Sequence, residues 1–219
     1  MADCPAVRPF ILLSLLLLLP FSAARAAGLV LRVEPGYSYW QLDAGRIQAQ
    51  AQAPGDEVRA LLVDQTQNAP TLSLLLGFNL FNHFTLSAGV TATGWDLRSA
   101  SRGGAGLVAG ELAWHPAALL LPSRPGWGRR WDVSLFFGAG YGMLGEQRAL
   151  DGLHLQFGGR GEYFLLPILS VGASLRYAPL FFGRYVRNLM AGESTALPDT
   201  SGGAVFIPAL TFSLHVPLG

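Results

Sequence analysis

The sequence predicts an all-β fold, an eight-stranded antiparallel up-and-down transmembrane β-barrel. Of its 219 residues, 51% are hydrophobic and only 13% are charged, which is too little charge for an ordinary soluble surface. After residue 26, apolar side chains recur at every second position, as in a strand with two different faces. A helical span would need about 20 consecutive apolar residues, and this part of the chain has no such run.

Residues 1–26 are predicted to be a cleaved signal peptide. Arg8 precedes an apolar run from Phe10 to Leu19, and Ala24-Arg25-Ala26 supplies small residues for cleavage. The run is shorter than a spanning helix requires, so an uncleaved anchor is the weaker alternative. We therefore expect residues 27–219 to form a single barrel domain, exported through the periplasm to the bacterial outer membrane.

The alternation is clearest between Phe84 and Thr93, where every even-numbered residue is apolar and every odd-numbered residue is small or polar. Leu75 and Phe136 are exceptions, because each is a large apolar residue on a polar face. Proline lacks a donor for the strand ladder, so we expect Pro35 and Pro208 at a bulge or near the barrel rim. The eight predicted strands are 29–39, 72–80, 84–93, 106–114, 131–141, 153–163, 169–177 and 205–216.

Side-chain size predicts which face points outward. A soluble lipocalin-like barrel also alternates, but it keeps its apolar face inside. Here the polar face is rich in Gly, Ser and Thr, which fit the narrow interior of eight strands, whereas the apolar face is bulky and would overfill it. The apolar face is therefore expected to contact lipid.

Aromatic residues fall near both ends of the predicted strands, as in the interfacial girdles of membrane barrels. From Phe84 to Trp95, a tilted strand spans roughly 25 to 30 Å, which is the height of an outer-membrane apolar band. One girdle comprises Phe84, Trp114, Trp131 and Tyr163, and the other comprises Tyr39, Trp95, Tyr141 and Tyr177.

The connections are expected to alternate between short turns in the periplasm and long loops outside the cell. Residues 81–83 and 165–167 form short turns, and both termini then lie on the periplasmic side. The connection 115–130 is long for a periplasmic turn. We expect it to lie along the membrane interface, and we assign it no function. The expected outer loops are 41–69, 96–103, 144–150 and 181–202.

Strand parity sends a nearly balanced set of charges into the lumen. Arginine and carboxylate side chains on adjacent strands are expected to share hydrogen bonds there and to plug the barrel. The alternative is a narrow channel for small solutes, including apolar ones. The predicted lumen charge network consists of Arg32, Arg160 and Arg176 with Glu34, Glu111, Asp132 and Glu162.

By these features the chain resembles the eight-stranded outer-membrane barrels, in particular the outer-membrane protein A-like and W-like porins. The hairpin 158–172 carries the resemblance, because its first strand ends in an aromatic, turns at Pro167 and restarts with alternating small residues. The chain departs from the pattern after Phe212, because it lacks the terminal aromatic of such families. The resemblance implies contact with outer-membrane lipid and lipopolysaccharide, with the barrel-assembly machinery during biogenesis, and with an envelope protein partner.

No catalytic, metal or cofactor site is predicted. All basic residues are arginines, which excludes lysine chemistry, and the near-neutral charge gives no basis for nucleic-acid binding. The histidines are scattered: His83 and His115 fall at turns, and His154 and His215 fall on lumen faces. We therefore expect a non-enzymatic barrel with a structural or surface-interaction role through its outer loops, and a lipid-modifying enzyme is a weaker alternative.

Overall fold

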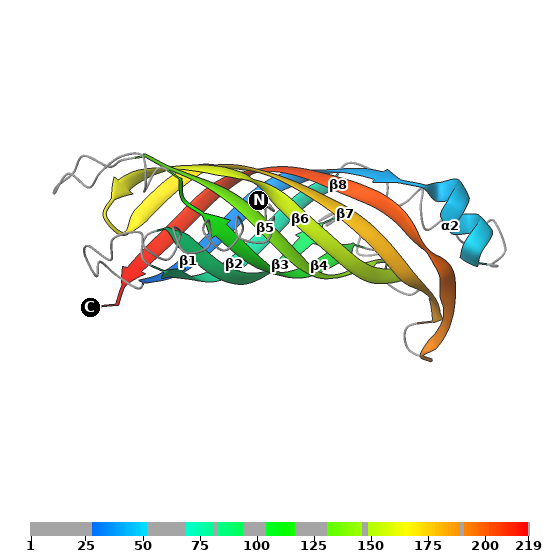
Figure 1. The fold of residues 1–219 in the computed structure, drawn as a ribbon. Helices are drawn as coiled ribbons and strands as arrows, with labels where there is room; N and C mark the ends of the chain where they lie inside the picture. The colour runs from blue at the N-terminus through cyan, green and yellow to red at the C-terminus, as the bar shows by residue number, and fades with distance from the viewer. Residues whose placement is uncertain are drawn as a thin grey trace, which may run out of the picture.

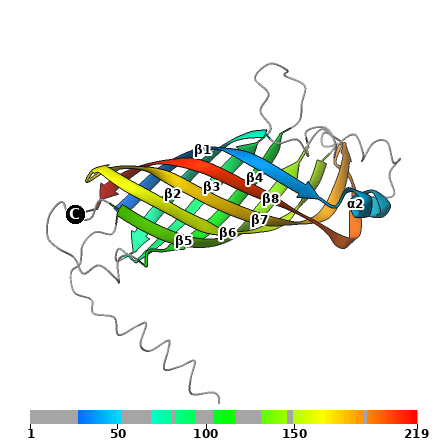
Figure 2. The same ribbon diagram turned by 90° about the horizontal axis from the view of Figure 1, so that it is seen from above.

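The computed structural model describes residues 28–51, 69–80, 83–93, 104–116, 131–145, 149–188 and 191–218. The predicted signal peptide lies outside the described residues. Each strand pairs antiparallel with the next, and β8 pairs with β1, so the sheet is a closed barrel (Figures 1 and 2). The eight strands are β1 (Gly28–Leu42), β2 (Ala69–Leu80), β3 (Phe84–Thr93), β4 (Ala105–Trp114), β5 (Trp131–Leu144), β6 (Ala149–Leu166), β7 (Leu169–Asn188) and β8 (Glu193–Pro217).

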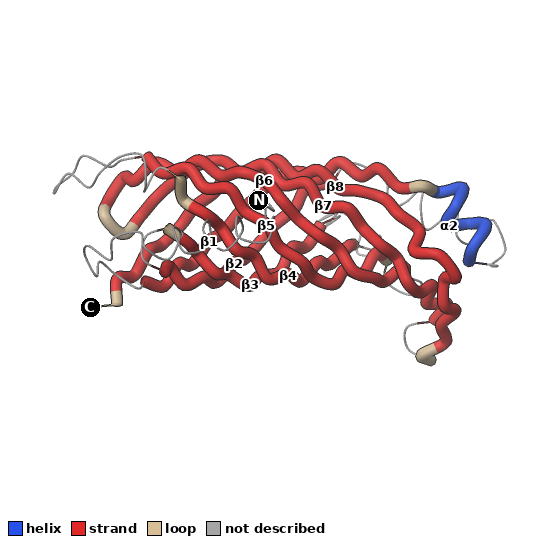
Figure 3. Tube along the Cα trace, viewed as in Figure 1, coloured by secondary structure: helices blue, strands red, loops and turns tan. Residues whose placement is uncertain are grey.

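The prediction of eight antiparallel strands in one barrel is confirmed. Gly28 pairs with Pro217, so the first and last strands begin and end together. We call this the turn end, because the short connections β2–β3 and β6–β7 also lie there. The opposite end, here the rim end, carries the helix α2 (Ala44–Ala51) beside the β7–β8 hairpin (Figure 3).

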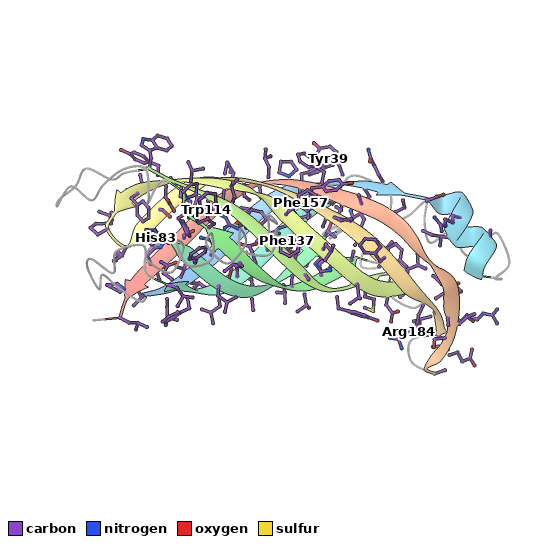
Figure 4. All side chains as sticks on the ribbon, viewed as in Figure 1. Tyr39, His83, Trp114, Phe137, Phe157 and Arg184 are labelled. Carbon is purple, nitrogen blue, oxygen red and sulfur yellow. The ribbon has the colours of Figure 1, made fainter. Side chains whose placement is uncertain are left out.

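The two faces of the wall follow the predicted parity. Leu86 is 56% exposed, whereas its neighbour Thr85 is 1% exposed. The outward side chains surround the barrel along its length in Figure 4, which places Trp114 towards the turn end and Arg184 towards the rim end. The bulky apolar face is therefore outside, and the small polar face lines the lumen.

The two prolines are accommodated differently from the prediction. Pro35 pairs with Leu72, and Pro208 pairs with Leu175, so both lie well inside their strands. The β1–β8 register is the same on either side, because Val33 pairs with Phe212 and Gly36 with Ala209. The expectation of a bulge or a rim position is wrong, because a missing donor removes one ladder bond without adding a residue.

The β7–β8 connection at the rim end is shorter than predicted. Residues 181–202 were expected to form a loop, but β7 continues to Asn188 and β8 starts at Glu193. Phe182, Tyr185 and Val186 are good strand formers, and pairing between the two strands outweighs the intervening loop-like residues. The expected loop 41–69 contains α2, and no helix among the described residues is long and apolar enough to span a membrane.

Aromatic side chains occupy the outer wall near both ends. At the turn end Phe84 pairs with Trp114, and the Trp131 ring lies 4.9 Å from the Tyr163 ring. Towards the rim end, Tyr39, Tyr141 and Tyr177 are outward and exposed. Trp95 lies outside the described residues.

Placing a charge at mid-wall should destabilise the barrel in proportion to its depth in the membrane. Leu135→Arg should cost roughly 2–4 kcal/mol, and Leu165→Arg, next to the turn end, roughly 0–1 kcal/mol. The two leucines are matched in exposure, at 51% and 50%. Urea titrations of refolding into lipid vesicles would measure both costs, and equal costs would contradict a membrane-embedded wall.

Candidate functional site

Among the described residues, six charged side chains of the lumen are at most 3% exposed. They come from β1, β4, β6 and β7, and their positions alternate with outward apolar residues. Three are cations and three are anions, so the group is neutral when all are ionised. We call it the lumen network; it consists of Arg32, Glu34, Glu111, Arg160, Glu162 and Arg176.

Arg160 is the centre of the lumen network. Its Nε donates to Glu34 Oε1 at 2.8 Å, and its Nη2 donates to Glu111 Oε1 at 3.2 Å. Arg176 completes the square, because its Nη2 donates to Glu34 Oε2 at 2.9 Å and lies 3.7 Å from Glu111 Oε2. Its Nη1 also donates to the Ser73 hydroxyl at 3.1 Å. Two guanidinium groups thus share two carboxylates in the middle of the barrel.

Phe136, an exception in the polar pattern, packs inside this group. The guanidinium carbons of Arg160 and Arg176 lie 4.8 Å and 5.7 Å from the centre of its ring. A side chain on Gly158 would come within 2.6 Å of the ring, so glycine makes room for it. The ring adds a cation–π contact and fills space that water would otherwise occupy.

Arg32 and Glu162 form a second pair nearer the turn end. Arg32 Nη2 donates to Glu162 Oε2 at 3.2 Å, and Arg32 Nε donates to the Ser213 hydroxyl at 3.1 Å. Ser213 in turn donates to Glu162 Oε1, and so does Ser170 at 2.9 Å. Ser170 also lies 3.0 Å from His215 Nε2. One guanidinium group and two serine hydroxyls therefore hold the Glu162 carboxylate.

Asp132 lies apart from the lumen network, contrary to its predicted membership. Its Oδ2 is 2.6 Å from His115 Nδ1, and His115 Nε2 is 2.8 Å from the Thr85 hydroxyl. This order of carboxylate, imidazole and hydroxyl resembles a nucleophile triad. However, Thr85 is 1% exposed and donates to Asn79 Oδ1 at 2.5 Å, so its oxygen has no room for a substrate. We interpret the group as a structural cross-link that connects β2, β3 and β5 through His115, the residue after β4.

The rim half of the lumen holds a cluster of buried apolar side chains, next to buried Ser38, Thr93 and His154. We call this cluster the apolar cap. Ile47 of α2, which has no exposed surface, packs among side chains from the strand ends. Asp43 positions the helix, because its carboxylate accepts from Arg46 N at 3.2 Å and its own N–H donates to Gly202 O. The apolar cap consists of Trp40, Ile47, Ala105, Leu107, Leu144, Leu150, Ala178, Leu180, Phe182, Tyr185, Leu197, Val205 and Ile207.

The apolar cap and the His115–Asp132 pair were not predicted from the sequence. The isolated Ile47 in a polar stretch was the only local signal for the cap. His115 gave none, since its partner follows after the long connection 115–130, of which 117–130 lie outside the described residues. In the part of the chain that the structure describes, no group of three or more His, Cys, Asp or Glu side chains could hold a metal ion.

Removing one cation from the lumen network should be costly. Arg160→Met leaves Glu111 and half of Glu34 buried without their nearest partner, and should destabilise the barrel by roughly 3–5 kcal/mol in urea titrations. Arg184→Met is the matched control, because Arg184 donates to Asp151 at 2.7 Å but is 56% exposed. Its cost should be much smaller. Similar losses of stability in both variants would show that water fills the lumen around Arg160.

Similarity to known proteins is found among solved structures. No family model matches the chain, and no curated protein matches it significantly. Among solved structures, Neisserial surface protein A matches with a TM-score of 0.48 and 9% identity, covering 87% of this chain and 97% of that one.

Two further matches are outer-membrane proteins. AlkL in lipid bilayers matches with a TM-score of 0.49 and 14% identity, over 91% of this chain and 96% of that one. OprG from Pseudomonas aeruginosa matches with a TM-score of 0.44 and 10% identity, over 89% and 98%. At such identities the likeness concerns the fold alone. These neighbours are small eight-stranded outer-membrane barrels, and this chain is an eight-stranded barrel as well.

Proposed function

We propose that this protein is a closed, non-enzymatic barrel of the bacterial outer membrane that acts through its rim end. The observation that carries the proposal is the neutral lumen network, in which Arg160 and Arg176 are paired with Glu34 and Glu111 across the barrel. Such a group fills the cross-section of an eight-stranded barrel, whose interior is just wide enough for side chains.

Two barriers in series support a closed lumen. A hydrated ion entering from the turn end first meets Arg32 and Glu162 and then the square around Arg160. From the rim end it meets the apolar cap, whose mostly apolar side chains offer an ion few polar partners to replace its water. Conduction would require both barriers to open.

The rim end is the part available for contact with other molecules. The β7–β8 hairpin and α2 lie there, and Arg46, Arg187 and Glu193 are exposed on them. Outer-membrane barrels normally have their short turns in the periplasm. The turn end would then face the periplasm, and the rim end would face the cell exterior, towards lipopolysaccharide and an envelope or surface partner. A tag inserted between Ala191 and Gly192 should then be labelled on intact cells, whereas labelling only after permeabilisation would reverse the orientation.

The apolar cap also favours a second function, the passage of small apolar solutes. A lumen lined by Leu107, Leu150 and Phe182 would suit such a solute if α2 moved away with Ile47. The ionic square below the cap opposes this function, because an apolar molecule cannot replace the hydrogen bonds of Arg160.

Planar-bilayer recordings test the closed lumen. The unmodified protein should show little steady conductance. Arg160→Ala should change this little, because the apolar cap remains, whereas Arg160→Ala combined with Leu107→Ala and Phe182→Ala should give clear openings.

Leu86→Ala and Phe137→Ala on the outer wall, added to Arg160→Ala, are the matched control, because they also remove one leucine and one phenylalanine side chain but leave the cap intact. Large, stable channels in the unmodified protein would overturn the closed barrel and make solute transport the better function.

A further inference from the structure

The His115 imidazole at the turn end makes a hydrogen bond through each of its two nitrogens. Its Nδ1 lies 2.6 Å from Asp132 Oδ2, and its Nε2 lies 2.8 Å from the Thr85 hydroxyl. A neutral imidazole has one N–H and one bare nitrogen, whereas an imidazolium donates from both nitrogens. The hydrogen atoms of the two partners therefore decide which form His115 takes.

The Thr85 hydroxyl has no hydrogen atom left for His115. A hydroxyl group has a single O–H, and that of Thr85 donates to Asn79 Oδ1 at 2.5 Å. Thr85 is 1% exposed, so solvent does not replace either partner. Its oxygen can only accept from the imidazole, and His115 Nε2 must carry a proton.

The Asp132 carboxylate is an acceptor as well. An ionised carboxylate has no hydrogen to donate, so the 2.6 Å contact requires a proton on His115 Nδ1. The short distance is typical of a hydrogen bond between a cationic donor and an anionic acceptor. With protons on both nitrogens, His115 is positively charged and forms an ion pair with Asp132.

The charges inside the barrel lead to the same form of His115. The lumen network has three guanidinium groups and three carboxylates, and Asp132 adds a fourth carboxylate at the turn end. One positive charge on His115 makes the cations and anions of this described set equal in number. Pairing of this kind avoids the cost of a largely buried carboxylate without a cationic partner.

The neighbouring titratable groups are occupied with other partners. Glu162 binds Arg32 and two serine hydroxyls, and His215 Nε2 lies 3.0 Å from the Ser170 hydroxyl. Asp132 is therefore the acid available to His115. The charged and titratable side chains around the pair are Arg32 of β1, His83 before β3, Glu162 of β6 and His215 of β8.

We propose that His115 is the fourth cation of the barrel interior, and that loss of its proton to solvent releases the cross-link at the turn end. The neutral ring would present a bare nitrogen to an oxygen that can only accept, so one of the two hydrogen bonds would be lost. Histidine changes its charge near neutral pH, which makes the cross-link sensitive to pH.

The sign of the pH dependence follows from the proton that the folded barrel holds. Stability that requires a bound proton is present at low pH and is lost as the pH rises. The cross-link should therefore be intact in acid and should loosen in alkali. The inference rests on the hydrogen bonds of His115 and does not depend on the closed lumen.

Nitrogen-15 NMR of the histidine rings in lipid bilayers tests the charge on the unmodified protein. At about pH 7.5, where an ordinary histidine is neutral, both nitrogens of His115 should be protonated. His154 provides the reference in the same spectrum, because neither of its ring nitrogens has a hydrogen-bond partner among the described residues. It should show one bare nitrogen, and His115→Gln assigns the His115 signals by removing them.

Two matched variants test whether Asp132 holds the proton on His115. Asp132→Asn removes the anion, so His115 should become neutral at about pH 7.5. Asp151→Asn is the control, because Asp151 is also paired with a cation, Arg184 at 2.7 Å, but lies at the rim end. It should leave His115 charged.

Urea midpoints of unfolding at about pH 6 and about pH 9 test the release of the cross-link. The midpoint of the unmodified protein should fall as the pH rises. His115→Gln should lose most of this fall, whereas His215→Gln, a change of the same kind on the opposite side of the turn end, should keep it.

A bare nitrogen on His115 at about pH 7.5 would overturn the proposal. A bare Nε2 would mean that the Asn79 amide is reversed and donates to Thr85, and a bare Nδ1 would mean that Asp132 carries the proton. A charged His115 combined with a midpoint that does not change with pH would overturn the release of the cross-link. The conductance of the barrel tests the closed lumen separately.

Discussion

The burial of three guanidinium groups inside a narrow barrel is the constraint on which the rest of this structure depends. An unpaired charge in such an interior is very costly, so each cation must meet a carboxylate. Arg160 meets two, Glu34 and Glu111, and these come from strands on different sides of the barrel. The pairs therefore link strands that share no backbone hydrogen bonds, and they join the wall across its centre.

This cross-linking explains features of the wall that are otherwise unconnected. Phe136 breaks the polar pattern because it packs against both Arg160 and Arg176. Gly158 is required beside it, since any side chain there would collide with the ring. Ser73 and Thr91 supply hydroxyls to Arg176 Nη1, and Ser213 supplies one to Arg32 Nε. The small residues of the lumen are thus matched to the large charged ones.

Most of the barrel wall could be predicted from the sequence, but the ion-pair partner of each buried charge could not. Alternation at residues 84–93 and in the other strands set the number of strands, their faces and the set of buried charges, because period two is a local property. Whether Arg160 meets Glu34 or Asp132 depends on the stagger between strands, which local pattern does not determine. The same limit explains why Asp132 was assigned to the lumen network, although it pairs with His115.

Predictions at the rim end were less accurate for a related reason. Residues 181–202 contain glycine, proline and charges and look like a loop, yet strand pairing extends the hairpin to Asn188 and Glu193. The helix α2 depends on the cap at Asp43 and on the burial of Ile47 in a cluster assembled from distant strands. Short elements of this kind are stabilised by tertiary contacts rather than by their own propensity.

Hydrogen exchange at the arginine side chains, measured by NMR in lipid bilayers, tests the closed lumen most directly. The Nε–H of Arg160 donates to Glu34, and the side chain is inaccessible to solvent. It should exchange with water far more slowly than the Nε–H of Arg184, which also donates to a carboxylate but is 56% exposed. Equal exchange rates at the two sites would mean that water fills the lumen, and the closed barrel would be wrong.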